Sequence, residues 1–259
     1  MSLLYTKTLR KEYGGVIAVR DVDFSVNEKS IIGCIGPNGA GKTTLFNNIT
    51  GLDRPTSGDI FFKGKNITKL PAYKITRLGI ARTFQNIRLF KEMTVMENIM
   101  IGRHFKSAHL SLTKNRTVSA VLGLINQRKE EIDIYESSQK WLKYLQLERF
   151  HDEFAKNLPY GKQRELEIAR ALATDPKILF LDEPAAGMNP IETEELIDII
   201  KMIKELGITI VLIEHDMKLV MKICERIIVL NYGSKIAEGT PEEIQNNPLV
   251  IEAYLGKSE

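Results

Sequence analysis

Short continuous runs of apolar residues recur along this chain, and most of them alternate with stretches of amphipathic pattern. Runs of a few residues rich in isoleucine, leucine and valine are typical of strands that are buried on both faces of a parallel sheet. Such runs lie at residues 31–35, 178–181 and 208–213. Helices are predicted after two of them, at residues 45–49 and 190–206. This alternation indicates an α/β fold with a mainly parallel sheet.

A second pattern, in which apolar and polar residues alternate, marks the first part of the chain. Residues 17–19 and 22–26 have this period of two, and residues 59–62 with Gly64 are typical of a β-hairpin. We therefore expect a β-rich lobe before and around the first helix. Further elements are predicted as a strand at 79–84, a helix after the capping box of Thr94 and Glu97, strands at 227–230 and 235–237, and a helix at 241–254.

Residues 104–158 change to a helical pattern, with lysine and glutamate on the polar side. The apolar positions of this segment keep one helical face. They are Val118, Val121, Leu122 and Ile125, followed by Ile134, Trp141 and Leu145. A face of this kind packs against a core more often than it binds a partner. The segment is therefore predicted to be a helical subdomain inserted into the α/β core.

A glycine-rich loop follows the first buried strand and leads into a helix. Its residues match the pattern G-x-x-x-x-G-K-[ST] and are Gly36, Pro37, Asn38, Gly39, Ala40, Gly41, Lys42, Thr43 and Thr44. Glycines let the backbone curl round a phosphate, so that successive N–H groups and the helix N-terminus point at its oxygens. Lys42 is expected to reach the β- and γ-phosphates, Thr43 to bind Mg²⁺, and Thr44 to help hold the α- and β-phosphates. A chance glycine turn is the alternative, and the flanking strand and helix argue against it.

Acidic and basic side chains stand where two later strands end. Asp182 follows the run 178–181, where a nucleotide-binding fold needs an acid for the Mg²⁺ shell, and Glu183 can orient or deprotonate a water. His215 follows the run 208–213 and so is expected at the same edge of the sheet. A lone histidine is more often structural, but this one stands between two acids at a strand end.

A second glycine-containing loop opens a helix at Gly161, between Gln85 and Asp182. Its N-terminus is another potential phosphate site. One chain has little use for two such sites on one ATP, whereas two chains arranged head to tail would use both. Tyr13 stands beside a turn of the β lobe, and two readings of it are open: it stacks on adenine, or it is an ordinary packed or surface tyrosine.

Composition narrows the class of protein. The 259 residues are 43% hydrophobic and 27% charged, which is ordinary for a globular protein, and the net charge of +3 is too small to indicate a nucleic acid partner. No apolar run approaches the length that crosses a bilayer, and the N-terminus lacks the apolar stretch of a signal peptide, so a cytoplasmic protein is expected. Cys34 and Cys224 lie in apolar runs and are expected to be buried, reduced thiols.

The order of these parts resembles the ATP-binding subunit of an ABC transporter along essentially the whole chain. Residues 36–44 are similar to the Walker A loop, residues 158–163 to the signature and residues 185–190 to the D-loop. Gln85 resembles the Q-loop glutamine, which implies a place near Mg²⁺ and the attacking water. Tyr13 resembles the aromatic residue that stacks on adenine.

The same resemblance identifies Asp182 with the Walker B acid, Glu183 with the catalytic glutamate and His215 with the switch histidine. It implies a P-loop ATPase that uses ATP and Mg²⁺, with an antiparallel β lobe and an inserted helical subdomain. The expected bounds are 1–90 with 159–259 for the ATP-binding core, and 91–158 for the helical subdomain. The implied partners are membrane permease subunits, a second copy or a paralogue and, indirectly, a periplasmic-type binding protein. The implied location is the inner face of the cell membrane.

Finer features resemble the ATPases of branched-chain amino acid importers, notably residues 82–90, 166–170, 183–190, 213–217 and 252–256. An ATPase of lipopolysaccharide export carries similar pieces and is the alternative, as is another ABC-head ATPase that is not coupled to amino acid transport. A chromosome-maintenance ATPase would need a far longer insertion before the signature, and a translation factor of the ABC type would need two heads. Pro159 and Lys162 depart from the usual signature, and Asn189 departs from the usual D-loop.

Overall fold

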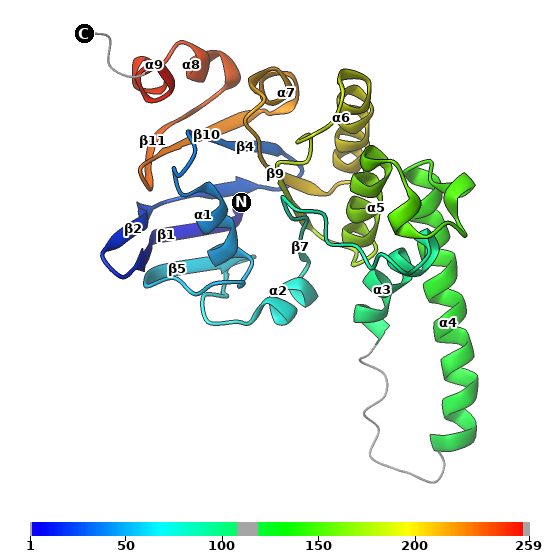
Figure 1. Cartoon of the computed structure of the whole chain (residues 1–259). Coiled ribbons are helices and arrows are strands. Elements are labelled where there is room, and N and C mark those ends of the chain that lie inside the picture. Colours follow the sequence, from blue (N-terminus) through cyan, green and yellow to red (C-terminus); the bar gives the residue numbers. More distant parts are fainter. Residues whose placement is uncertain (1, 108–118, 256–259) are drawn as a thin grey trace. The chain divides into compact units, whose positions relative to one another are not determined.

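The computed structural model describes residues 2–107 and 119–255 (Figure 1). The chain forms two compact units, of which the first combines Met1–Gln85 with Lys177–Glu259 and the second is Asn86–Pro176. Residues 86–90 and 159–176 thus belong with the helical unit, whereas the sequence led us to place them with the ATP-binding core. The reason is that the signature helix packs on the helices of the insertion.

A six-stranded sheet forms the centre of the first unit. Its strands follow the order β11 (Ser234–Gly239), β10 (Arg226–Asn231), β4 (Ile31–Ile35), β9 (Thr209–Ile213), β8 (Ile178–Asp182) and β7 (Ile80–Arg82). Every neighbouring pair is parallel except β10 with β11. Strands β4, β8 and β9 are buried along their whole length, because helices lie on both faces of a parallel sheet. The predicted parallel sheet is confirmed.

Six helices belong to the described part of the first unit. They are α1 (Lys42–Ile49), α2 (Ala72–Leu78), α6 (Pro190–Glu205), α7 (Met217–Ile223), α8 (Pro241–Gln245) and α9 (Pro248–Leu255). Helix α6 begins with a capping box, in which the Asn189 side chain accepts from backbone N–H groups and Glu192 closes the box. The single helix predicted at 241–254 is wrong. It is two helices, because Asn246 ends α8 and Asn247 accepts a hydrogen bond from the Leu249 N–H at the start of α9.

A second, antiparallel sheet forms the β lobe of the same unit. Strand β1 (Ser2–Tyr13) pairs with β2 (Val16–Val22), β3 (Ser25–Asn27) and β5 (Ser57–Phe62), and β5 pairs with β6 (Lys65–Asn66). The predicted strand 22–26 is divided, because the Phe24 N–H donates to the Thr6 hydroxyl at 2.9 Å. One apolar core joins this lobe to the parallel sheet through α1, where Phe46 packs edge to face on Phe180.

Helices make up the second unit. They are α3 (Val95–Ser107), α4 (Ser119–Tyr144) and α5 (Tyr160–Leu172), with short turns at Glu148–Phe150 and Ala155–Asn157. The capping box of Thr94 and Glu97 at the start of α3 is confirmed. Ile134, Trp141 and Leu145 are buried, which confirms the core-facing interpretation of this part of the stripe. Val118 and the side chains of Val121, Leu122 and Ile125 lie outside the described residues. Within the described helices, no segment has both the length and the apolar character of a membrane span.

Candidate functional site

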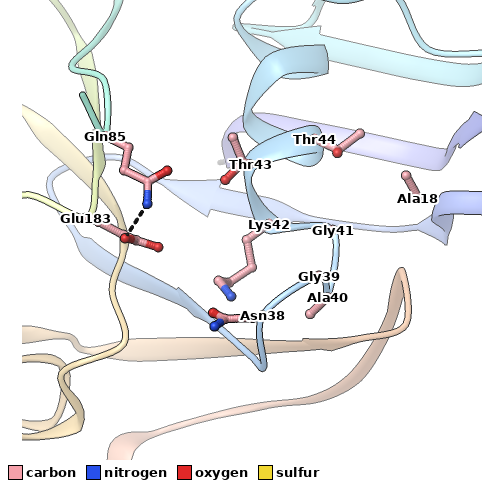
Figure 2. Close-up of a pocket in the computed structure, with 10 residues that line it drawn as sticks. All are labelled: Ala18, Asn38, Gly39, Ala40, Gly41, Lys42, Thr43, Thr44, Gln85 and Glu183. Carbon is pink, nitrogen blue, oxygen red and sulfur yellow. Dashed lines mark hydrogen bonds between the residues drawn. The ribbon is translucent and has the colours of Figure 1, made fainter. Parts of the chain in front are cut away.

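The glycine-rich loop between β4 and α1 forms the floor of a pocket of about 280 Å³ in the α/β unit (Figure 2). The loop curls round this pocket, while Gln85 and Glu183 approach it from the opposite side. The lining residues are Ala18, Asn38, Gly39, Ala40, Gly41, Lys42, Thr43, Thr44, Gln85 and Glu183. The pocket therefore joins the loop to the ends of strands that are distant in sequence.

Two glycines fix the path of the loop. Gly36 has φ +147° and Gly41 has φ +97°, which favour glycine. A Cβ on Gly36 would lie 2.0 Å from the Leu230 carbonyl oxygen, and one on Gly41 would lie 2.2 Å from the Ala18 carbonyl oxygen. Any larger residue at either position would move the loop, so the sequence pattern reflects packing of backbone against backbone.

Lys42 is held inside the loop. Its ammonium donates to the carbonyl oxygens of Gly36 at 2.6 Å and Pro37 at 2.9 Å, and its side chain is buried. Burial lowers the pKa of Lys42, while Cys34, Glu183 and Asp182 act in the opposite direction. An ammonium that is partly desolvated and bound to neutral carbonyls is well suited to transfer its hydrogen bonds to phosphate oxygens.

Glu183, Gln85 and His215 meet at the carboxyl edge of the sheet. The Gln85 side-chain N–H donates to the Glu183 carboxylate at 2.8 Å (Figure 2). The Nδ1 atom of His215 lies 4.0 Å from the same carboxylate, and the His215 side chain is exposed. Glu183 has φ +47°, an uncommon conformation for a residue with a Cβ. Its backbone N–H donates to the Ile213 carbonyl, which ties the end of β8 to the end of β9.

Asp182 is buried at the end of β8, and one of its oxygens is paired. Arg82 donates to the Asp182 Oδ2 atom at 2.6 Å, and both side chains are at most 5% exposed. Within the described part of the chain, the Oδ1 atom has no hydrogen-bond partner. A buried carboxylate oxygen without a partner is costly unless a cation or its water shell binds it. Mg²⁺ takes oxygen ligands and keeps several waters, so Asp182 and the Thr43 hydroxyl fit this ion.

Tyr13 lies near the same loop, at the end of β1. Its hydroxyl donates to the Asp53 carboxylate, and the Lys11 ammonium lies 4.6 Å from the centre of its ring. Burial, then the hydrogen bond to Asp53, raises the pKa of Tyr13 to about 12, and the nearby Thr44 hydroxyl opposes this shift. The ring is 47% exposed, so it has a surface on which a base can stack.

Gly161 lies in the first turn of α5, in the helical unit. Pro159 is the N-cap of α5 and caps it with no side-chain hydrogen bond, as its ring predicts. The Gln163 side chain donates to the Leu158 carbonyl at 2.9 Å and holds the turn that precedes the helix. The structure thus places Gly161 at a helix start, as expected, while the pocket is built by the α/β unit.

Sequence reasoning missed two buried charged residues of this site. Arg82 pairs with Asp182, and Glu214 accepts hydrogen bonds at the end of β9. The sequence did contain a signal for Arg82, because a cation at the end of a buried strand requires a partner of opposite charge. Glu214 gave no comparable signal, because it simply follows the end of an apolar run. Only the tertiary structure identifies its partners.

Cys34 and Cys224 are both buried and unbonded. Burial raises the pKa of each thiol to about 12. Among the described residues, no cluster of histidine, cysteine, aspartate and glutamate has the composition of a protein-only metal cage. The prediction that both cysteines are buried is confirmed.

A parallel sheet, a phosphate-binding loop after β4, and acids at the ends of neighbouring strands define a P-loop nucleoside triphosphatase. The family profile described as "ABC transporter" matches residues 19–186, and a profile described as "Branched-chain amino acid ATP-binding cassette transporter" matches residues 234–259. The chain belongs to the ABC transporter family, and it is an ATP-binding ABC ATPase.

Curated relatives cover nearly the whole chain. It is 47% identical to the high-affinity branched-chain amino acid transport ATP-binding protein BraF of Pseudomonas aeruginosa, over 99% of this chain and 98% of the relative. It is 46% identical to the corresponding protein LivG of Salmonella typhimurium, with the same coverage. A lipopolysaccharide export ATP-binding protein, LptB of Haemophilus influenzae, is 35% identical over 99% of this chain and 98% of its own.

Solved structures agree with the fold. The crystal structure of a nucleotide-free ATP-binding cassette from an ABC transporter matches with a TM-score of 0.84 and 35% identity, over 99% of this chain and 100% of the other. The predicted ABC ATPase head, with a parallel core sheet, an antiparallel lobe and a helical insertion, is confirmed.

Proposed function

We propose that this chain is the ATP-hydrolysing subunit of an importer for branched-chain amino acids. The observation that carries the hydrolytic part of the proposal is the juxtaposition of Glu183, Gln85 and His215 beside the phosphate-binding pocket. Such an arrangement can orient and deprotonate a water for attack on a terminal phosphate.

In this proposal, residues 36–44 hold the phosphates of ATP and Tyr13 stacks on adenine. Glu183 takes the proton of the attacking water, Gln85 orients that water, and His215 contacts the γ-phosphate from the same edge. Thr43, Gln85 and Asp182 would hold Mg²⁺, which neutralises charge on the phosphates when bound. Among the residues that the structure describes, the Oδ1 atom of Asp182 has no hydrogen-bond partner, which supports this assignment.

The proposed working form is a head-to-tail dimer with a second copy or a paralogue. Gly161 would then contact the ATP held by the partner's loop, because its helix start offers N–H groups to an anion. A solved relative, 26% identical to this chain, is described as the dimeric structure of a bacterial ABC transporter cassette, which supports a dimer. The helical unit, Asn86–Pro176, carries the signature loop in this arrangement.

A membrane permease is the proposed partner that uses the energy of hydrolysis, and it would hold this subunit on the cytoplasmic face of the membrane. A periplasmic-type binding protein would deliver the amino acid and act on this chain only indirectly. Branched-chain amino acids are favoured over lipopolysaccharide because the BraF and LivG proteins are more similar than LptB over the same span. The family profile that matches residues 234–259 also favours branched-chain amino acids.

Reconstitution tests this function. The tagged full-length chain would be purified together with its permease, placed in lipid vesicles with the binding protein, and supplied with MgATP. We expect ATP-dependent uptake of leucine, isoleucine and valine, and no uptake with the Lys42→Ala variant. Robust ATP hydrolysis without uptake of any of the three would overturn the cargo assignment, whereas absence of hydrolysis would overturn the enzymatic one.

A further inference from the structure

Glu214 is a fully buried carboxylate at the end of β9, directly before His215. It is not needed to fill the sheet, because the apolar run of β9 ends one residue earlier. Its side chain turns back toward the loop that follows Glu183. A buried charge in this position requires specific partners, since desolvation of a carboxylate is otherwise strongly unfavourable.

Those partners are three backbone N–H groups from two loops. The Oε1 atom accepts from the Ala185 N–H at 2.8 Å. The Oε2 atom accepts from the His215 N–H at 3.0 Å and, over a longer distance of 3.4 Å, from the Asp216 N–H. One oxygen thus holds the loop after β8, and the other holds the loop after β9.

These two loops carry the chemistry proposed above. Ala185 is two residues beyond Glu183, whose backbone has the uncommon φ of +47°. The Nδ1 atom of His215 lies 3.6 Å from the Glu214 carboxylate and 4.0 Å from that of Glu183. Burial raises the pKa of Glu214, while the three N–H groups and His215 favour its ionised form.

We propose that Glu214 is a positioning residue that holds the loop of Glu183 and the loop of His215 in a fixed relation. Glu214 is not among the residues that line the pocket, so it acts through these two residues. The inference rests on the proposed roles of Glu183 and His215. A carboxylate is required because both of its oxygens accept N–H groups, whereas an amide offers one oxygen and turns an NH₂ group toward a donor.

The test is Glu214→Gln in the full-length chain, which keeps the size of the side chain. We expect kcat for ATP hydrolysis to fall by about 10²-fold, the loss typical of a small misplacement of catalytic groups. The dissociation constant for a fluorescent ATP analogue should stay within about twofold of wild type, because residues 36–44 are untouched. Asp216→Asn is the matched control, since it removes one charge from the same loop and keeps an amide oxygen for the N-cap of α7.

A double-variant comparison separates positioning from a general structural role. Because Glu214 acts through Glu183 and His215, Glu214→Gln should lower the residual rate of Glu183→Gln by much less than the roughly 10²-fold by which it lowers the wild-type rate. Equal kcat in Glu214→Gln and wild type, a full additional loss on top of Glu183→Gln, or a weakened ATP analogue would each overturn the inference. Glu214→Asp keeps the charge but is too short to reach both loops, so it should lower kcat in the same way if the glutamine variant does not fold. Failure of the wild type to hydrolyse ATP would instead refute the proposed function.

Discussion

Replacing Arg82 by leucine is the most direct test of how the acid at the end of β8 is held. The Arg82 guanidinium donates to Asp182 at 2.6 Å and to the Asn47 side-chain oxygen at 2.6 Å. It also lies 5.7 Å from the ring centre of Phe46 and 5.4 Å from that of Phe84. Leucine would fill part of this space and would leave the Asp182 carboxylate buried without its ion-pair partner.

The magnitude follows from the burial of the pair. Side-chain exposures of 5% for Arg82 and 2% for Asp182 place the ion pair among buried ones, where removal of one partner costs about 3–5 kcal/mol. For a unit of this size, each kcal/mol lowers Tm by about 2–4 °C, so the melting transition should fall by about 6–20 °C. Most of the lost stability comes from leaving the Asp182 carboxylate buried and unpaired, and not from losing the attraction between Arg82 and Asp182.

Calorimetry of the full-length chain without nucleotide or Mg²⁺ measures this effect, because bound ligand would add stability of its own. The control is the double variant Arg82→Leu with Asp182→Leu, which removes both charges and should recover most of the lost stability. A transition within about 2 °C of wild type for Arg82→Leu, or a double variant as unstable as the single one, would refute the reasoning.

Three further predictions concern the site and the thiols. Glu183→Gln should keep ATP binding and lower turnover by about 10² to 10⁴-fold. Sizing chromatography of this variant with ATP should show an accumulated dimer, and a monomer with a near wild-type rate would contradict the role of Glu183 as the catalytic base. Gly161→Asp should abolish dimerisation and hydrolysis yet leave ATP binding to the monomer unchanged in titrations, and a loss of binding as large as that of Lys42→Ala would place Gly161 in its own chain's pocket. Burial raises the pKa of the Cys34 and Cys224 thiols to about 12, so at pH 8 each has about a thousandfold less thiolate than an exposed cysteine. Both cysteines should therefore react with a thiol reagent only in denaturant. Rapid labelling of the native protein would contradict their burial.

Sequence predicted the core sheet well because a strand that is buried on both faces must be apolar throughout. The runs ending at Ile35, Leu181 and Ile213 have no other plausible structure at that length. The phosphate-binding loop was equally clear, since its glycines are required by contacts of backbone with backbone at Gly36 and Gly41.

Short helices and buried charges were harder to predict, for physical reasons. Helices α2 and α7 have only seven residues each, too few to establish a helical period. The break between α8 and α9 depends on how Asn246 and Asn247 use their local hydrogen bonds, for which the sequence offers competing possibilities. The partners of Arg82 and Glu214 are distant in sequence, and so only the folded chain identifies them.

The edge-to-face contact of Phe46 with Phe180 has a mechanical consequence. Phe46 lies one turn after Lys42 in α1, and Phe180 lies two residues before Asp182 in β8. Their ring centres are 4.8 Å apart in a close-packed core, which resists compression and shear. The helix that begins at the phosphate-binding loop and the strand that ends at Asp182 are therefore packed directly against each other. A displacement of the loop when nucleotide binds should therefore reach Asp182 through close-packed side chains.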